Sequence, residues 1–348
     1  MAVVPPFMKV PLQQQKENFH QLNDLEAARI RSGLRLPEES DWSVADGINK
    51  ANAKRNRYTN VFPYDISRVK LPLNEDATGT DYINASYVKL YSSLKNSKLS
   101  ADTEKTLESE LTPPPESTYI AAQGPLEATV NQFWSMAYNE SEKQNNEVIL
   151  IVMVTPLTES GMVKCNRYWP DKDQKVLEMA AENKQDGIDI SGLTLEHVSE
   201  TYDEIGDFLL TEMNLKSSSK SKKVYHFYYY KWADSRVPAS IYPLLYLSEE
   251  INSIRKLVEN PPIPIVHCSA GVGRTGTFIA IDHLFRDFDK FIAVCDKAKS
   301  SKGYDIDFDP VFQTVLQLRD SRMMMVQTAY QFSFLYESAK KLYKERFK

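Results

Sequence analysis

The stretch at residues 265–276, IVHCSAGVGRTG, constrains the fold of this chain more than any other. An apolar run at 263–266 ends in His267 and Cys268, and a turn containing glycines leads into the apolar residues 277–281. This order predicts a strand, a tight loop and a helix. Such a loop points successive backbone N–H groups inward at the positive end of a helix dipole, so it can bind an anion such as phosphate.

Two side chains add chemistry to this loop. Cys268 stands at its entrance, and Arg274 follows within the same loop. The helix terminus, the inward N–H groups and the guanidinium all favour a thiolate, and such surroundings lower a cysteine pKa from about 8.5 to roughly 3.5–7.5. A guanidinium fits two phosphate oxygens at once. The alternative is a buried thiol at a strand end beside an ordinary glycine turn.

The sequence HCSAGVGRTG resembles the HCxxGxxR[ST] signature of the cysteine-based protein tyrosine phosphatases, and its other motifs resemble those of the phosphotyrosine-specific, non-receptor members. The resemblance covers residues 20–345. It implies a single α/β catalytic domain with a twisted mixed β-sheet flanked by helices on both sides. Residues 1–19 are then an N-terminal arm and the start of the first helix, and residues 90–117 form a surface insertion rich in Ser, Lys and Glu.

The resemblance assigns roles within the loop. It makes Cys268 the nucleophile, places Arg274 on the phosphate oxygens, and gives Thr275 the task of stabilising the returning thiolate. His267 supports the loop. The remaining residues bind phosphate oxygens through their backbone N–H groups, and they are Ser269, Ala270, Gly271, Val272 and Gly273.

Residues 54–65, KRNRYTNVFPYD, resemble the KNRYxxVxPYD segment of the phosphotyrosine-specific members. The resemblance places Tyr58 against the substrate ring, as one wall of a pocket too deep for phosphoserine. Asn60 stands where the family usually has an aspartate that holds the peptide backbone. An amide oxygen accepts such a hydrogen bond less strongly than a carboxylate, so we expect weaker peptide binding. The alternative for Tyr58 is an ordinary core aromatic.

Two segments contain a candidate general acid. Residues 169–171 spell Trp-Pro-Asp, but their context, KCNRYWP, matches a structural motif of the family, and Asp171 lies too far before Cys268. Asp234 has the spacing of the family's acid loop, and Trp232 matches the tryptophan of that loop. We therefore predict Asp234 as the acid. Ala233 replaces the usual proline, which would have restricted the loop backbone.

Four more site residues follow from the resemblance alone. Glu159 matches a glutamate that holds the loop arginine, and its alternative is a surface glutamate. Lys164 is the first residue of the KCxxYWP motif, and the resemblance gives it a supporting role in the site. Residues 319–331, RDSRMMMVQTAYQ, resemble the RxxRxxxVQTxxQ element, which places Gln327 on the hydrolytic water and Gln331 beside the phosphate.

The remaining sequence predicts ordinary elements. Residues 1–10, with two prolines, read as a loose arm. Apolar spacing predicts helices and strands along the rest of the chain. The expected helices cover residues 12–30, 129–138, 244–258 and 310–320, and the expected strands cover 81–88, 148–154, 193–198, 208–211 and 224–230.

Composition narrows the function classes. A net charge of −5 does not suggest a nucleic-acid or membrane partner. Three cysteines without metal-ligand spacing indicate a reducing compartment, and neither a signal peptide nor a long apolar run is apparent. We expect a cytoplasmic protein, and access to the nucleus stays open as an alternative. The resemblance implies phosphotyrosine-containing proteins as partners and neither cofactor nor metal. The oligomeric state stays open.

These features predict hydrolysis of phosphotyrosine in proteins through a cysteinyl-phosphate intermediate, as part of signal transduction. Two other classes stay open. A phosphotyrosine-binding pseudoenzyme keeps the pocket without turnover, and Ala233 and Asn60 are the residues that favour it. A dual-specificity phosphatase has a shallower site, which Tyr58 argues against.

Overall fold

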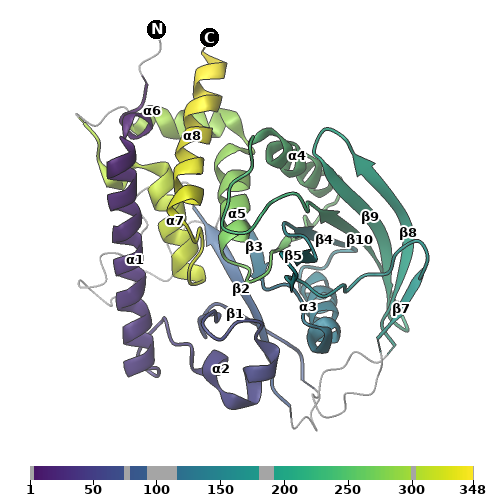
Figure 1. Ribbon diagram of the computed structural model, residues 1–348. Coiled ribbons are helices and arrows are strands. Elements are labelled where there is room, and N and C mark those ends of the chain that lie inside the picture. Colours follow the sequence, from purple (N-terminus) through teal and green to yellow (C-terminus); the bar gives the residue numbers. More distant parts are fainter. Residues whose placement is uncertain (1–3, 74–78, 92–115, 180–191, 299–302, 348) are drawn as a thin grey trace.

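The structure, a computed structural model, describes residues 4–73, 79–91, 116–179, 192–298 and 303–347 (Figure 1). Most of the predicted insertion at 90–117 therefore lies outside the described residues. A nine-stranded mixed sheet runs through the molecule in the order β1-β2-β3-β11-β4-β10-β9-β8-β7. The bounds are β1 (Arg68–Lys70), β2 (Tyr82–Leu90), β3 (Ser117–Ala122), β4 (Val148–Met153), β7 (Val176–Glu178), β8 (Thr194–Asp203), β9 (Phe208–Lys216), β10 (Ser221–Tyr228) and β11 (Ile265–His267).

The four central strands, β3, β11, β4 and β10, are parallel to one another, and every other pairing in the sheet is antiparallel. Parallel strands are usually buried on both faces, and the near-continuous apolar run of β4 meets that condition. Successive side chains of a strand point to opposite faces, so one strand can feed two cores. Leu150 joins one apolar cluster and Ile151 the other.

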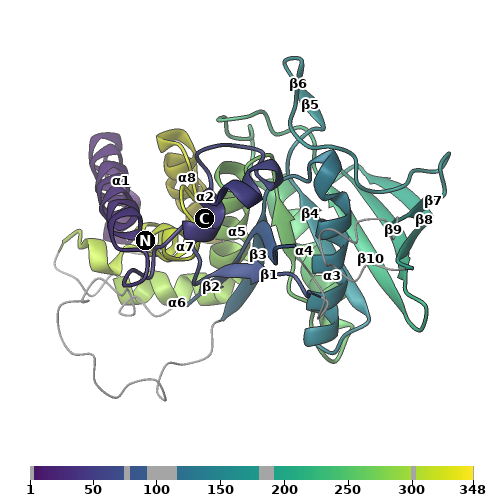
Figure 2. The same cartoon turned by 90° about the horizontal axis from the view of Figure 1, so that it is seen from below.

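Helices cover both faces of the sheet, as Figure 2 shows from below. On one face α3 (Val130–Lys143) contributes Phe133 and Trp134 to the smaller core. The other face carries the remaining large helices and the larger core. These helices are α1 (Leu12–Arg35), α4 (Tyr242–Lys256), α5 (Gly273–Phe285), α6 (Phe288–Ala298), α7 (Pro310–Ser321) and α8 (Ala329–Arg346). The short α2 (Ala45–Ile48) lies near β1.

The N-terminal residues do not form a loose arm, and that prediction is wrong for residues 4–10. A 3₁₀ turn, η1 (Pro6–Lys9), starts with a proline, whose fixed φ suits a first helical position. Phe7 and Met8 are buried in the larger core, and η1 contacts α8. The following helix, α1, runs unbroken past residue 19 and contacts α7 and α8.

The sheet order determines where the predicted phosphate-binding loop lies. β11 stands between β3 and β4, and all three end at the same edge of the sheet because they are parallel. In open α/β sheets the crevice outside the carboxyl ends of the strands is where ligands bind. Cys268 follows directly after β11, and α5 begins five residues later, at Gly273, so the loop opens into this crevice.

Candidate active site

The loop between β11 and α5 is held tightly against the sheet. Gly271 has φ +72°, and a Cβ at this position would lie 2.1 Å from the carbonyl oxygen of Ala122 in β3. Arg322, fully buried at the end of α7, donates from Nε to the Gly271 carbonyl at 2.9 Å and from Nη2 to the Ala270 carbonyl at 3.0 Å. These bonds hold the carbonyl oxygens of the loop on the side away from the sulfur.

The Cys268 sulfur lies on the N–H side of the same loop. Burial by itself opposes an ionised thiol, but the Arg274 charge, the Thr275 hydroxyl and the backbone N–H groups of Thr275 and Val272 outweigh it. Together they lower the pKa of Cys268 below its ordinary value. A thiolate is the reactive form of cysteine, so the loop supplies a nucleophile.

Arg274 connects the loop to two other segments. Its side chain is 1% exposed, and its Nη1 donates to the Trp232 carbonyl at 2.8 Å. Its Nη1 lies 3.6 Å from Glu159 Oε2, and its Nη2 lies 3.4 Å from Asp234 Oδ1. The arginine is thus held by the predicted partner Glu159 and by the segment that carries the candidate acid.

Asp234 lies over the loop with its carboxylate paired to two cations. Lys164 Nζ donates to Oδ2 at 2.9 Å, and Arg274 approaches Oδ1. The Asp234 backbone N–H donates to Glu159 Oε1 at 2.8 Å. Partial burial raises the pKa of this carboxyl, but Lys164 and Arg274 outweigh burial, and the pKa is lowered. Without a bound phosphate, Asp234 is therefore ionised near neutral pH.

Tyr58, which is predicted to form one wall of the pocket for the substrate ring, lies beside the loop. Ser269 donates its hydroxyl proton to the Lys164 carbonyl at 2.7 Å, so the Tyr58 hydroxyl is the donor in its 2.8 Å bond to Ser269 Oγ. Arg57 fixes the backbone below Tyr58, because it donates to the carbonyls of Gly124, Pro125 and Val163. Asn60 is exposed at the rim of the same cleft.

His267 is buried behind the loop and has a defined tautomer. Its Nδ1 faces the Cys268 carbonyl at 3.1 Å, so this nitrogen carries the proton. Burial lowers the pKa of His267 to about 4, so the ring is neutral at pH 7 and its Nε2 accepts from the Tyr168 hydroxyl at 2.6 Å. Tyr168 in turn accepts from His226 Nε2 at 2.7 Å. The network supports the strand end that carries Cys268.

The two glutamines approach the loop from the start of α8, Gln327 from the turn before it and Gln331 from its first turn. Gln327 is exposed in the cleft, and its Oε1 lies 3.1 Å from the place a Cβ on Gly273 would take. Gln331 is buried, with its Nε2 3.2 Å from the same place. Its Oε1 accepts from the Thr328 N–H at 3.2 Å, so it also caps α8.

One cleft of about 490 Å³ brings most of the predicted residues together. Its lining includes Tyr58, Asn60, Lys164, Asp234, Cys268, Ser269, Ala270, Gly273, Arg274 and Gln327. Asp171 is not part of this lining. Its Oδ1 accepts from the N–H groups of Asp173 and Gln174, and its Oδ2 lies 3.6 Å from Arg167. The Trp-Pro-Asp tripeptide therefore leads into a turn outside the cleft.

A sequence model described as protein-tyrosine phosphatase matches residues 52–341. The chain belongs to the protein-tyrosine phosphatase family. Family membership confirms the prediction of a phosphatase that removes phosphate from phosphotyrosine in proteins.

Relatives of this phosphatase show how far the likeness extends. Tyrosine-protein phosphatase 1 of Saccharomyces cerevisiae is 36% identical over 98% of this chain and 98% of its own length. Tyrosine-protein phosphatase 1 of Schizosaccharomyces pombe is 29% identical over 95% of this chain but 51% of its own length. A structure of PTPN18 in complex with HER2-pY1196 phosphopeptides superposes with a TM-score of 0.70 at 25% identity, covering 95% of this chain and 93% of that one. The predicted fold is confirmed.

Sequence reasoning missed the role of two buried residues of the phosphatase. Arg322 was part of a recognised motif, but nothing local showed that it holds the loop carbonyls. Tyr168 was part of another motif, and its bonds to two histidines were not foreseen. A buried arginine or tyrosine needs partners, and this is the general signal that could have marked both residues.

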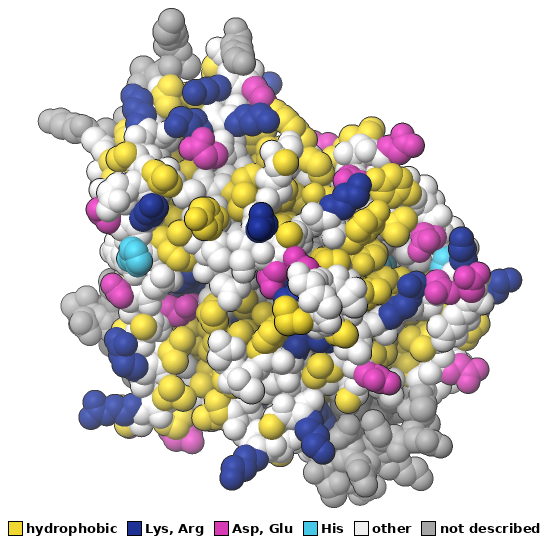
Figure 3. All heavy atoms as spheres, in the orientation of Figure 1, with side chains coloured by type: hydrophobic (Ala, Val, Ile, Leu, Met, Phe, Trp, Pro, Cys, Tyr) yellow, Lys and Arg dark blue, Asp and Glu magenta, His cyan; other side chains and the backbone are white. Residues whose placement is uncertain are grey.

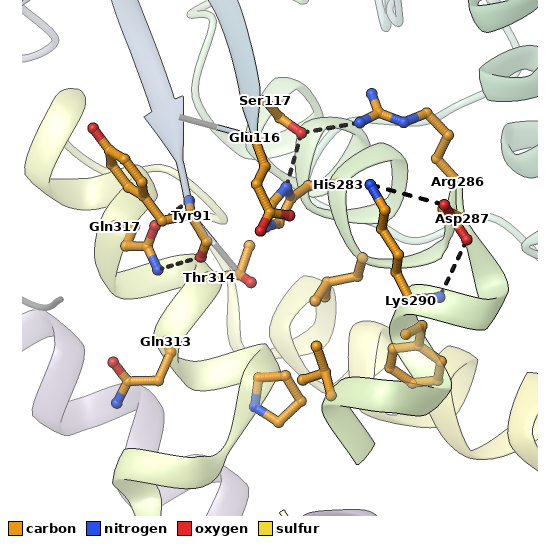
Figure 4. Close-up of a pocket in the computed structure, with 14 residues that line it drawn as sticks. Tyr91, Glu116, Ser117, His283, Arg286, Asp287, Lys290, Gln313, Thr314 and Gln317 are labelled. Atoms are coloured by element: carbon orange, nitrogen blue, oxygen red, sulfur yellow. Dashed lines mark hydrogen bonds and ion pairs between the residues drawn. The ribbon is translucent and has the colours of Figure 1, made fainter. Parts of the chain in front are cut away.

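A second cavity of about 90 Å³ lies between α5, α6, α7 and the ends of β2 and β3 (Figure 4). Its wall includes His283, ten residues along α5 from Gly273, or about 15 Å at the helical rise. Arg286 donates to Asp282 and to Ser117, and Lys290 lies 3.9 Å from Asp287. The cations of this wall are thus engaged with protein groups.

Two further findings concern the described part of the chain. No helix there is long and apolar enough to span a bilayer. Within the same ranges, His, Cys, Asp and Glu side chains do not form a group of three or more that could hold a metal ion.

Proposed function

We propose that this phosphatase works by two-step phosphoryl transfer through a phosphocysteine on Cys268. The observation that carries the proposal is the lowered pKa of Cys268 in a loop that also holds Arg274, with Asp234 directly over that arginine. The loop N–H groups and the guanidinium lie where they can bind phosphate oxygens, as electrostatic catalysis requires.

In the first step the Cys268 thiolate attacks phosphorus. The new S–P bond forms while the P–O bond to the tyrosyl oxygen breaks, and Asp234 donates its proton to that oxygen. A positioned acid typically contributes about 10²–10⁴-fold to such a step. The dephosphorylated protein, with its tyrosine hydroxyl restored, leaves, and the phosphoryl group stays on sulfur.

In the second step water attacks the phosphocysteine. Gln327, exposed in the cleft, orients the water, and the Asp234 carboxylate accepts its proton. The S–P bond breaks, inorganic phosphate forms, and the thiolate returns to the hydrogen bonds of the loop, including that of Thr275. Gln331 packs against the loop at Gly273 and supports this side of the site.

A bound phosphate raises the pKa of Asp234, so that this residue can act as an acid. In the free site, Arg274 and Lys164 lower the pKa of this carboxyl. A phosphate dianion on Arg274 neutralises the nearby positive charge and adds negative charge, and both changes raise the pKa of Asp234. The acid thus takes up its proton when substrate is present.

We propose phosphotyrosine-containing proteins as the physiological substrates and signal transduction as the setting. The PTPN18 structures that resemble this chain hold phosphotyrosine peptides, which supports the substrate class. Three free cysteines fit a reducing compartment, so we propose the cytoplasm, with access to the nucleus, as the location. We also propose that residues 20–345 carry the catalytic machinery, with residues 4–19 packed onto it.

The decisive experiment compares variants on a phosphotyrosyl peptide and on an aryl phosphate. Cys268→Ser should abolish turnover of both substrates while the peptide still binds. Asp234→Ala should lower turnover of the peptide by about 10²–10⁴-fold, and the control Asp171→Ala should not lower it. An unaltered rate in Cys268→Ser would refute the nucleophile. A wild-type chain that binds the peptide but leaves aryl phosphate intact would be a pseudoenzyme.

A further inference from the structure

The rim of the active-site cleft has an apolar side. It is formed by the hairpin of β5 (Thr158–Glu159) and β6 (Met162–Val163), which projects from the front of the molecule in Figure 1 and from its top in Figure 2. Met162 is 58% exposed and Val163 is 53% exposed, and both line the cleft that contains Cys268. Large apolar side chains left open at a substrate cleft are candidates for substrate contact.

The register of this hairpin settles which way Met162 faces. Ser160 and Gly161 both have positive φ, as the type I′ turn of a two-residue hairpin requires. Glu159 pairs directly with Met162, and directly paired residues lie on the same face of a hairpin. Glu159 uses that face to reach Arg274 and the Asp234 N–H. Met162 is therefore on the face turned to the catalytic groups.

The charged groups of the cleft offer little to an acidic peptide. The cations that line it are Arg57, Lys164 and Arg274. Arg57 donates to backbone carbonyls, and Lys164 donates to Asp234. Arg274 donates to the Trp232 carbonyl within the site. Figure 3 shows many exposed hydrophobic side chains on the front face, with Lys and Arg side chains scattered among them. The chain also carries a net charge of −5, which repels acidic segments.

We propose that Met162 determines specificity by contacting the side chain next to phosphotyrosine in the substrate and favouring a large apolar residue there over an acidic one. The inference rests on the proposed function, because it concerns the substrate of the same cleft. An unbranched thioether adapts to differently shaped apolar partners, so the preference is for bulk and apolarity rather than for one residue type. Asn60, neutral at the same rim, leaves the peptide backbone less firmly held and gives this side-chain contact more weight.

The test uses phosphotyrosyl peptides that differ only at the two positions adjacent to phosphotyrosine, which are Leu in one peptide and Glu in the other. An aryl phosphate without neighbouring residues is the reference substrate. For the wild-type chain, we expect kcat/KM to favour the Leu peptide over the Glu peptide by about ten-fold, the lower end of the discrimination expected from one apolar contact.

Two variants at position 162 probe the contact. Met162→Ala should reduce the Leu-to-Glu ratio by about three-fold or more, mainly through KM of the Leu peptide, because a binding contact is removed. Met162→Lys should move the preference toward the Glu peptide. The matched control is Val198→Ala, because Val198 is 54% exposed on β8 and does not line the cleft. It should leave the ratio unchanged.

The outcomes separate this inference from the function on which it rests. A wild-type chain that hydrolyses the aryl phosphate but treats the Leu and Glu peptides alike would overturn the inference and leave the proposed function intact. The same holds if Met162→Ala slows all three substrates equally, because Met162 would then act only by supporting Glu159. Failure of the wild-type chain on the aryl phosphate would instead overturn the proposed function.

Discussion

Cys268 shows how the pKa of a buried thiol can be lowered. Burial is the largest influence on its pKa and acts against the thiolate. The opposing influences come from its own loop and the first turn of α5: one guanidinium, one hydroxyl and two backbone N–H groups. Because these groups belong to one continuous segment, the loop can assemble wherever the flanking strand and helix are held in place.

Asp234 should set the pH dependence of the first step. It must be protonated to donate, so activity falls as pH rises through its pKa, and a pKa lowered in the free chain places the optimum of kcat/KM on the acid side of neutrality. Asp234→Asn carries no titrating proton. Its pH profile should lose the alkaline fall, and its kcat should be about 10²–10⁴-fold lower.

The control is Asp171→Asn, whose carboxylate accepts from backbone N–H groups of its own turn. Its pH profile should match that of the wild-type chain. If instead Asp171→Asn flattened the alkaline limb, the acid would be misassigned.

Arg322 should matter for stability as well as for the loop. Besides the two loop carbonyls, it donates to Asn84 Oδ1 at 2.6 Å and to Ser86 Oγ at 3.2 Å. Arg322→Met leaves these buried acceptors without a donor, and each such loss costs about 1–3 kcal/mol. We expect the free energy of unfolding, measured by urea denaturation, to fall by about 3 kcal/mol or more.

Arg167→Met is the matched control, because Arg167 is 40% exposed and its ion pair with Asp171 is 3.6 Å long. It should change the free energy of unfolding by less than about 1 kcal/mol. Equal effects of the two substitutions would mean that Arg322 does not hold the loop.

At the residue scale, the sequence identified those side chains whose roles depend on near neighbours. Cys268 and Arg274 share one loop, and Asp234 stands at a fixed spacing before them. The role of Arg322 could not be read in this way, because its partners Asn84 and Gly271 are distant in sequence and meet it only in the folded chain.

At the scale of elements, the acid loop is anchored at its start. Lys231 directly precedes Trp232. Its Nζ lies 2.6 Å from Oδ1 of Asp207, in the turn between β8 and β9. Because Ala233 lacks the rigidity of proline, we expect this anchor to help hold the loop over Arg274. Lys231→Met should lower kcat of peptide hydrolysis about two- to five-fold, in keeping with the small effect of an exposed ion pair.

The rate of thiol alkylation should stay unchanged in Lys231→Met, because the anchor does not touch Cys268. The pair Lys220 and Glu142 is similarly exposed and lies elsewhere, so Lys220→Met serves as the control and should leave kcat unaltered. A Lys231→Met chain with wild-type kcat would show that the loop does not depend on this anchor.

Elements with a clear apolar pattern were predicted and others were not. The buried strand β4 and the helices α1, α4 and α7 appear close to their expected bounds. No helix was assigned to α6, although Phe288, Phe291, Ile292 and Cys295 have helical spacing that could have predicted it. The turn η1 was interpreted as a loose arm, since its burial depends on α8, more than three hundred residues away.

At the scale of the whole molecule, the predicted insertion is attached to the domain at a closed stem. The Glu116 N–H donates to the Leu90 carbonyl at 3.0 Å, and Tyr91 exchanges two hydrogen bonds with the side chain of Gln317. β2 and β3 pair antiparallel up to this point, so a short hairpin loop can join them.

Replacing residues 92–115 by a linker of about four residues should therefore preserve the fold, because hairpin loops of two to five residues are common. We expect kcat/KM for an aryl phosphate to stay within about two-fold and the melting temperature to change by a few degrees at most. A chain that no longer folds, or that loses most of its activity, would show that the insertion belongs to the catalytic domain.

The overall architecture was predictable because one motif carries so much information. The strand-loop-helix unit, together with the resemblance of its neighbours, indicated the mixed sheet and the layers of helices. The contacts of α1 with α7 and with the segment that follows α7 could not be predicted. Arg319 pairs with Glu26, and the Met324 N–H donates to Glu26. These contacts join the two ends of the chain and depend on the complete fold.

The most direct test is the rate at which iodoacetate alkylates Cys268, measured as a function of pH with and without inorganic phosphate. A thiolate stabilised by the loop should react at a rate whose midpoint lies well below the pKa of about 8.5 of a free cysteine, and phosphate should protect it. A midpoint near 8.5, with no protection by phosphate, would contradict a loop built to hold an ionised sulfur beside a phosphoryl group.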